Sequence, residues 1–347
     1  MIYGHGSDAY RYGGKIQMDF SSNVFTHADH SQLLKHLGSL SGVLNTYTEP
    51  EPLTLERMIA EEQGLQPQSV MVTAGVTEAI YLIAQLYQGY ASIIPQPAFY
   101  EYEEACKTNG HTVSYYDNDE MEVLPEQRLY WLCNPSNPTG AVMLRSLMTY
   151  VVRHHQQYVF VIDQSLAPFT RQEPLRYADM QDCHNLILLH SLSKRFCAPG
   201  LRLGYITASP IIIDRLRLLR RPWSVSALDN EAGKYLLDHH YEPLADREAY
   251  LEEARRLHDE LANTEGLMLM DSDSNIMLAY LNEGDAPHMK NWLIENHGIL
   301  IRDASNFHGL DSHCFRVSAQ YPKENDLLVQ AIREYLRGTS RHFTKYW

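Results

Sequence analysis

The stretch from Ser191 to Tyr205 constrains this chain most, because it places a lysine between two apolar segments. Residues 185–190 are expected to form one buried strand, and residues 201–207 another. Lys194 lies between them, and a lysine is rarely buried unless it is paired or functional. The sequence therefore indicates either a functional lysine or a cluster of Lys and Arg on the surface.

The side chains around Lys194 suit chemistry with a phosphorylated aldehyde. A desolvated amine whose pKa is lowered can attack an aldehyde and form a Schiff base. Ser191, Ser193 and Arg202 could hold a phosphate at the same place through hydroxyl and charge-assisted hydrogen bonds.

Composition narrows the class of protein. A chain of 347 residues, 44% apolar and 21% charged, can bury a large core and is expected to form two domains of a soluble globular protein. The net charge of −14 argues against nucleic acid and anionic membranes as partners. Neither a secretory signal nor an apolar run of roughly 18 residues is visible. Five cysteines without CxxC spacing favour reduced thiols in the cytoplasm, and the histidine spacing predicts no metal site.

A strand, a glycine turn and a helix follow one another near residue 75. Residues 69–74 are rich in β-forming side chains, Gly75-Val76-Thr77 forms the turn, and residues 79–86 favour a helix. Such a turn presents free backbone N–H groups to a phosphate, although many turns without a phosphate have the same pattern. Phe99 follows the next strand and could either pack internally or stack on a planar cofactor.

Two more predicted strands end in polar groups. Residues 128–133 lead into Asn-Pro-Ser-Asn-Pro-Thr-Gly, and the two Asn-Pro pairs require a fixed, non-helical turn that projects Asn137. The strand at 158–162 ends on Asp163, at the edge where parallel α/β sheets place their sites. A helix cap is the alternative role for Asp163.

The remainder of the chain has a different pattern. A helix is expected at 211–221, and 227–262 is expected to form one long helix or two helices that separate near Pro243. Short strands at 275–280, 298–302 and 314–318, with a helix at 289–295, predict a smaller α+β domain. Arg302 and Arg316 interrupt apolar strands and need anions, which a substrate carboxylate or internal salt bridges could supply.

Taken together, the motifs resemble the pyridoxal-phosphate enzymes of fold type I, specifically the class I/II aminotransferases. The resemblance runs from His5 to Arg316 and rests on Asn-Pro-Ser-Asn-Pro-Thr-Gly and Ser-Leu-Ser-Lys…Gly-Leu-Arg-Leu-Gly. The most similar subgroup contains histidinol-phosphate aminotransferase and threonine-phosphate decarboxylase. It implies an α/β fold with a large, mostly parallel domain at 45–250 and a small domain from 1–44 and 251–347. The implied activity is amino transfer between an amino acid or phosphorylated amine and a 2-oxo acid; decarboxylation of phosphothreonine is the alternative.

The resemblance also implies roles for single residues. Lys194 would bind pyridoxal 5′-phosphate (PLP) and then transfer protons, and Asp163 would pair with the pyridinium nitrogen. Asn137 would bind the 3-oxygen of the ring and Phe99 would stack on its face. The phosphate would lie among Gly75, Val76, Thr77, Ser191, Ser193 and Arg202.

Further implied contacts involve the substrate and a second subunit. Arg316 would bind the substrate carboxylate, with Arg302, Asn23 and His5 as additional substrate contacts. Tyr47 would reach the phosphate in the other subunit, which implies a homodimer with shared active sites.

Two positions depart from the family pattern. Leu166 stands where an aromatic residue commonly helps to hold the 3-oxygen, so that hydrogen bond is expected to be missing. Val76-Thr77 replaces a more usual small-acidic pair, which leaves the side-chain contacts of this turn open.

Overall fold

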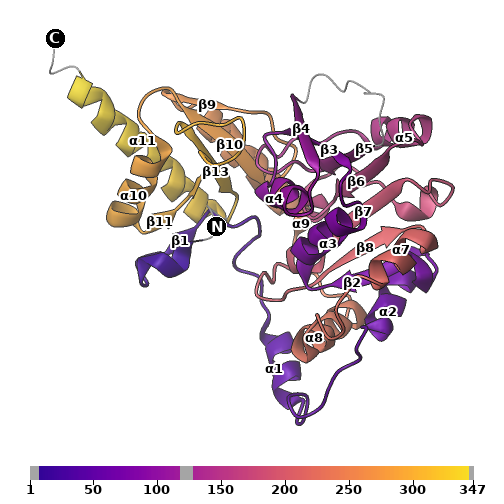
Figure 1. Cartoon of the computed structure of the whole chain (residues 1–347). Helices are drawn as coiled ribbons and strands as arrows, with labels where there is room; N and C mark the ends of the chain where they lie inside the picture. The colour runs from indigo at the N-terminus through magenta and orange to yellow at the C-terminus, as the bar shows by residue number, and fades with distance from the viewer. Residues whose placement is uncertain (1–7, 118–127, 344–347) are drawn as a thin grey trace.

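A seven-stranded sheet forms the centre of the larger lobe (Figure 1). The structure is a computed structural model and describes residues 8–117 and 128–343. The strand order is β2-β8-β7-β6-β5-β3-β4, and only β8 runs antiparallel to its neighbours. The mostly parallel α/β fold is therefore confirmed. The strands are β2 (Val70–Thr73), β3 (Ala91–Gln96), β4 (Thr112–Asp117), β5 (Arg128–Cys133), β6 (Val159–Asp163), β7 (Leu186–Ser191) and β8 (Gly204–Ala208).

Helices cover both faces of this sheet because its strands are apolar on both sides. Trp131 of β5 packs with the apolar faces of α3, α4 and α7, whereas Phe160 of β6 packs with α5 on the other face. The outer strand β2 packs against α2 and α8. The helices of this lobe are α2 (Leu53–Gln63), α3 (Gly75–Leu86), α4 (Tyr100–Thr108), α5 (Arg145–His154), α6 (Leu192–Arg195), α7 (Pro210–Arg217) and α8 (Ala227–Asp238).

The second lobe contains a four-stranded antiparallel sheet in the order β12-β13-β10-β9. Phe20 and Phe25, close to the start of the chain, are buried in its core, and β1 pairs in parallel with β11. The elements are β1 (Met18–Asp19), β9 (Leu267–Leu269), β10 (Ile276–Leu281), β11 (Ile299–Leu300), β12 (Arg302–Asp303), β13 (Cys314–Ser318), α9 (Arg247–Ala262), α10 (Ala286–His297) and α11 (Pro322–Phe343).

Several predicted boundaries differ from those of the structure. The region 227–262 forms two helices, α8 and α9, and Pro243 lies in the segment between them. The strand predicted from residue 201 begins only at Gly204, and the one predicted at 298–302 is divided into β11 and β12.

The division of the chain into a large domain at 45–250 and a small domain from 1–44 and 251–347 stays a prediction. The packing of α1 favours one change to these bounds. Leu33 of α1 (Ser31–Ser39) belongs to the same buried core as Leu55 of α2 and Leu236 of α8, which places α1 with the larger lobe. In the described part of the chain, no helix has both the length and the apolar character that crossing a membrane requires.

Candidate active site

Strand ends and loops of both lobes meet around a cavity of about 500 Å³. Most residues that the sequence singled out line this cavity. Tyr47 does not line it, and His5 lies outside the described residues. The predicted residues in the wall are Asn23, Gly75, Val76, Thr77, Phe99, Asn137, Asp163, Ser191, Ser193, Lys194, Arg202, Arg302 and Arg316.

Lys194 projects into the cavity from α6, a single turn that follows β7 directly. The side chain of Ser191 caps this turn, because its Oγ accepts a hydrogen bond from Lys194 N at 3.2 Å. Burial, together with the nearby charges of Arg316 and Arg202, lowers the pKa of Lys194 to about 8. About one fifth of such an amine is neutral near physiological pH, against about a thousandth of an unperturbed lysine, and the neutral form is the one that attacks an aldehyde.

This lowered pKa predicts how the cofactor-free chain takes up PLP at different pH values. The neutral fraction of Lys194 increases as the pH rises, so the rate of covalent cofactor binding should rise about tenfold per pH unit below pH 8 and level off above it. Stopped-flow absorbance between pH 6 and 9 measures this rate. A rate that does not change between pH 6 and 8 would show that another step, or another group, controls binding.

Asp163 is the last residue of β6 and is 4% exposed. Its Oδ1 accepts a hydrogen bond from Ser165 N at 2.8 Å, and its Oδ2 accepts one from the Tyr102 hydroxyl at 2.7 Å. Burial raises the pKa of Asp163, while the hydrogen bonds from Ser165 and Tyr102 act in the opposite direction. Asp163 thus holds the backbone of the turn that follows β6 and also lines the cavity. It does not cap a helix, because the helical turn at Ala167–Phe169 has Leu166 at its N-cap position, and its role toward the cofactor stays a prediction.

Tyr102 is a site residue that sequence reasoning did not single out. It lies in the first turn of α4, is 1% exposed, and stacks on Trp131 with 5.3 Å between ring centroids. Its hydroxyl reaches Asp163 only because α4 packs on the same face of the sheet as Trp131. The sequence signal was an aromatic group beginning at Phe99, which does not tell which ring faces the strand end.

Replacing Asp163 with asparagine tests the role of this carboxylate. The amide of the variant keeps the size of the side chain and its hydrogen-bonding capacity toward Tyr102, but it cannot carry the charge that favours a protonated ring nitrogen. The Asp163→Asn variant is therefore expected to retain bound cofactor and to lose about 10²–10³-fold in turnover. Steady-state kinetics with the visible spectrum measure both, and near-normal turnover would reduce Asp163 to a turn cap.

The turn at Gly75 and the loop at Arg202 form a close-fitting cradle. Gly75 has φ +77°, and a Cβ atom there would lie 2.7 Å from Arg202 Nη2. A Cβ atom at Gly204 would lie 2.8 Å from Gly75 C and Val76 N. The cradle opens onto the N-terminus of α3, where backbone N–H groups and the positive end of the helix dipole favour a phosphate.

The hydroxyl of Ser193 has a structural partner in this cradle. It donates to Leu201 O and accepts a hydrogen bond from Leu203 N at 3.2 Å. Ser193 therefore holds the loop that carries Arg202, and any contact with a phosphate would be additional to this role.

Arg316 on β13 is 2% exposed and faces the cavity from the smaller lobe. Its Nη1 donates to Asn137 Oδ1 at 2.5 Å and its Nη2 to Ser21 O at 2.7 Å. Burial and then the charge of Arg302 lower the pKa of Arg316, although a guanidinium stays charged at neutral pH. Within residues 8–117 and 128–343, no carboxylate forms an ion pair with Arg316, and its Nε has no hydrogen-bond partner. The structure therefore does not show the internal salt bridge that was the alternative role for Arg316.

Arg302 on β12 is 8% exposed and lies in the same wall. Its Nη2 donates to Asn306 Oδ1 at 2.7 Å, and its guanidinium lies 5.4 Å from the centre of the Phe307 ring. Asn306 and Phe307 also line the cavity and were not predicted as site residues. Leu166 lines it too, and its apolar side chain offers no hydrogen bond, as expected for this departure.

The residues of the cavity fit PLP. Lys194 provides an amine of lowered pKa and Asp163 provides a buried carboxylate. At Gly75 the Arg202 guanidinium occupies the space that a side chain would need, so a cationic group lies directly beside the turn. This combination of groups on a mostly parallel α/β sheet identifies the protein as a PLP-dependent enzyme of fold type I.

The chain belongs to the class I and II aminotransferase family, whose model, "Aminotransferase class I and II", matches residues 15–332. This family depends on PLP, which is therefore the cofactor. An L-threonine-O-3-phosphate decarboxylase structure from Porphyromonas gingivalis is 34% identical, with a TM-score of 0.89 over 92% of this chain and 99% of that one. A putative threonine-phosphate decarboxylase of Caldanaerobacter subterraneus is 30% identical over 84% of this chain and 83% of that protein. A histidinol-phosphate aminotransferase of Thermoanaerobacter sp. is 29% identical over 94% of this chain and 93% of that protein.

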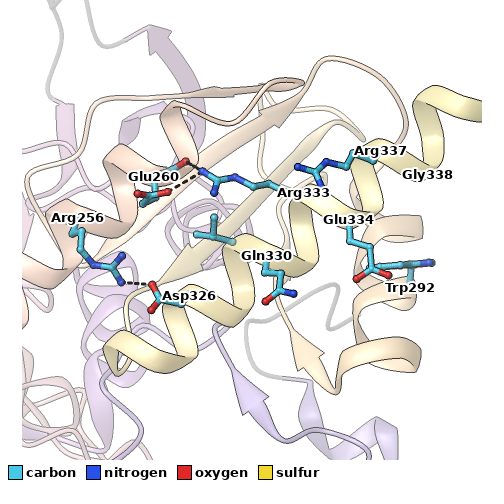
Figure 2. A pocket seen from close by; sticks show the side chains of 10 residues that line it. Arg256, Glu260, Trp292, Asp326, Gln330, Arg333, Glu334, Arg337 and Gly338 are labelled. Atoms are coloured by element: carbon cyan, nitrogen blue, oxygen red, sulfur yellow. Dashed lines mark hydrogen bonds and ion pairs between the residues drawn. The ribbon is translucent and has the colours of Figure 1, made fainter.

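A second hollow lies against α11 in the smaller lobe and contains none of the predicted residues (Figure 2). Its charged side chains are largely paired with one another, with Arg256 bound to Asp326 at 2.7 Å and Arg333 to Glu260 at 2.9 Å. Among the described residues, no group of three or more His, Cys, Asp or Glu side chains could hold a metal ion.

Proposed function

We propose that this protein transfers an amino group between an amino acid, or a phosphorylated amine, and a 2-oxo acid. The observation that carries the proposal is the convergence of Lys194 and Arg316 on one cavity, which Asn137, hydrogen-bonded to Arg316, also lines. An amine that can move a proton and a buried cation that can hold a carboxylate are the two groups that this reaction requires from the protein.

The residues would divide the reaction among them. When bound, PLP withdraws electrons from the substrate Cα and makes its proton acidic. Lys194 Nζ would accept that proton, and the guanidinium of Arg316 would hold the substrate carboxylate. Asp163 would hold a proton on the pyridine nitrogen, and Asn137, fixed by Arg316, would bind the 3-oxygen. Phe99 would cover the ring from the start of α4.

Decarboxylation of phosphothreonine is the second candidate, and the observation that favours it is the presence of two buried arginines in one wall. Arg302 and Arg316 occupy paired positions on the neighbouring strands β12 and β13, which suits a substrate with both a carboxylate and a phosphate. The names of the Porphyromonas and Caldanaerobacter relatives agree with this substrate. Asn23 lines the same cavity and would contact either substrate.

The visible spectrum of the purified protein, recorded before and after adding glutamate alone, tests the proposal. Conversion of the lysine-bound cofactor to its amine form is the expected result for an aminotransferase. If the spectrum does not change, phosphothreonine is added and released carbon dioxide is measured. Carbon dioxide without any amine form of the cofactor would replace the first candidate with the second, and failure to bind PLP at all would contradict both.

We also propose a homodimer in which Tyr47 completes the site of the partner. Tyr47 is 88% exposed, lies outside the cavity of its own chain and is 5.2 Å from the ring of Trp223, which is itself 50% exposed. Two large aromatic side chains exposed together mark an interaction surface. Sedimentation analysis measures the oligomeric state.

We place the enzyme in the cytoplasm because all five cysteines are free thiols.

A further inference from the structure

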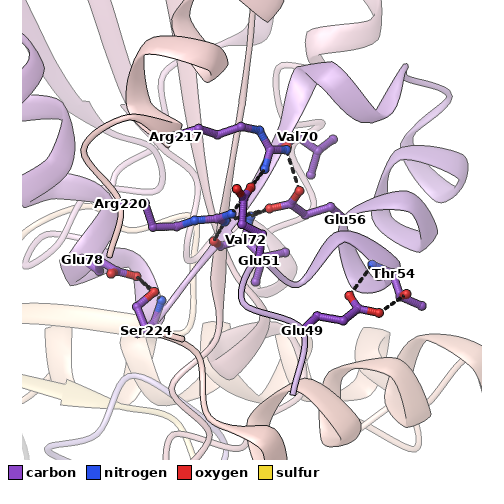
Figure 3. Close-up of polar contacts among 11 residues, drawn as sticks. Glu49, Glu51, Thr54, Glu56, Val70, Val72, Glu78, Arg217, Arg220 and Ser224 are labelled. Carbon is purple, nitrogen blue, oxygen red and sulfur yellow. Dashed lines mark hydrogen bonds and ion pairs between the residues drawn. The ribbon is translucent and has the colours of Figure 1, made fainter. Parts of the chain in front are cut away.

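The edge strand β2 is held from outside by side chains where another strand would otherwise pair (Figure 3). Glu56 Oε1 accepts a hydrogen bond from Val72 N at 3.0 Å, and Arg220 Nη1 donates to Val72 O at 3.0 Å. Arg217 Nη2 donates to Val70 O at 3.0 Å. Backbone groups at a sheet edge need such partners, and here charged side chains provide them.

These side chains form an ion-pair network with a buried centre at Glu56 and Arg220 and a more exposed rim at Glu51. Arg220 and Glu56, whose side chains are 2% and 1% exposed, are 2.9 Å apart, and Arg217 lies 2.5 Å from the second oxygen of Glu56. Glu51 bridges the two arginines at 2.6 Å from each. A buried network of this kind is weak evidence for stability, because well-packed apolar residues often stabilise a fold as well. What distinguishes this network is that it contacts the backbone of β2 directly, at Val70 and Val72.

The same segment of the chain also ties the residues around the Gly75 turn. Ser224 Oγ donates to Glu78 Oε2 at 3.3 Å, and the same oxygen accepts a hydrogen bond from Ala74 N at 2.6 Å (Figure 3). Residues 217–224 therefore hold both β2 and the turn that follows it. None of the network side chains lines the catalytic cavity.

On the side that faces Arg202 and Gly204, the turn at Gly75 has little free space. The absent Cβ atoms of Gly75 and Gly204 leave only enough room for Arg202 and for the backbone of the turn itself. A displacement of β2 would therefore change the distance between the N–H groups of the turn and the Arg202 guanidinium. We propose that Glu56 and Arg220 are positioning residues that set the phosphate-binding geometry of the Gly75–Thr77 turn without touching the cofactor. This inference rests on the assignment of that turn to the cofactor phosphate.

The test compares two ligands that differ only in the phosphate. The full-length chain, freed of PLP, is titrated with PLP and with pyridoxal while visible absorbance is recorded. In Glu56→Gln and Arg220→Lys, affinity for PLP should fall about tenfold, whereas affinity for pyridoxal should stay within about twofold. The ³¹P resonance of bound PLP should shift in the same variants, because the surroundings of the phosphate change.

Control variants separate positioning from general loss of structure. Glu260→Gln breaks an ion pair in the other lobe and should leave both affinities and the ³¹P resonance unchanged. Ser224→Ala removes one hydroxyl and serves as the milder variant if the charge variants unfold, with a smaller loss of PLP affinity expected. Equal losses for both ligands, or no loss in any folded variant, would overturn the inference. Equal affinities in the unaltered protein would instead overturn the phosphate assignment, and the inference with it.

Discussion

Replacing Lys194 with alanine is expected to remove the visible absorbance of lysine-bound cofactor and to lower turnover by at least about 10⁴-fold. Lys194 is an amine in the cavity with a pKa lowered to about 8, and it lies on α6, the single turn that follows β7. The cradle at Gly75 and Arg202 is untouched by this change, so PLP should still bind without a covalent bond. Absorbance after gel filtration, together with steady-state kinetics, measures both effects.

A matched control is available on α11. Lys323 is exposed, and Lys323→Ala should leave both the spectrum and the turnover unchanged. A Lys194→Ala protein that keeps the absorbance of lysine-bound cofactor would contradict the assignment of the catalytic amine and require another lysine.

Replacing Arg316 with alanine should weaken the binding of carboxylate substrates by about 2–5 kcal/mol, because a buried charge partner is lost. The variant also leaves Asn137 Oδ1 and Ser21 O without the donor that they have now. Affinity should therefore fall by about 30-fold to several thousandfold for an amino acid, but far less for the corresponding amine without a carboxylate. Apparent affinities for the two ligands, measured from the change in the cofactor spectrum, give the comparison.

Two further variants define the cause of such a loss. Arg316→Lys keeps the charge but not the two-pronged geometry, so it should recover only part of the affinity. Arg256→Ala, which removes the ion pair between α9 and α11 at the second hollow and leaves the residues of the catalytic cavity unchanged, should have no effect on either ligand. An unchanged affinity in Arg316→Ala would assign this arginine to the support of Asn137 alone.

The parts of the site that the sequence could predict are those in which local rules fix the geometry. Asn137 follows from paired Asn-Pro steps, Asp163 from a polar residue at a strand end, and Lys194 from a short turn between two strands. Each of these rules concerns a few neighbouring residues. The parallel sheet then brings the three side chains together, because the carboxyl ends of its strands share one edge.

The remainder depends on packing between distant segments. Tyr102 reaches Asp163 because of the face on which α4 packs, and Asn306 enters the cavity because β12 and β13 pair. The network around Glu56 and Arg220 joins residues more than 160 positions apart in the chain. Neither periodicity nor spacing encodes such contacts, so the sequence could not predict them.

The pairing of β1 with β11 has a consequence for the biosynthesis of the chain. Met18 lies beside Ile299, and Phe20 and Phe25 are buried in a core that is made mostly from α9 onward, with Leu166, Phe169 and Cys197 from the middle of the chain. The ribosome releases these aromatic residues more than 200 residues before α9 (Arg247–Ala262), where most of the residues that cover them begin. At about 5–20 residues per second, the interval lasts on the order of tens of seconds. During that time the nascent chain exposes an apolar segment, which leaves it open to aggregation until the residues from α9 onward emerge.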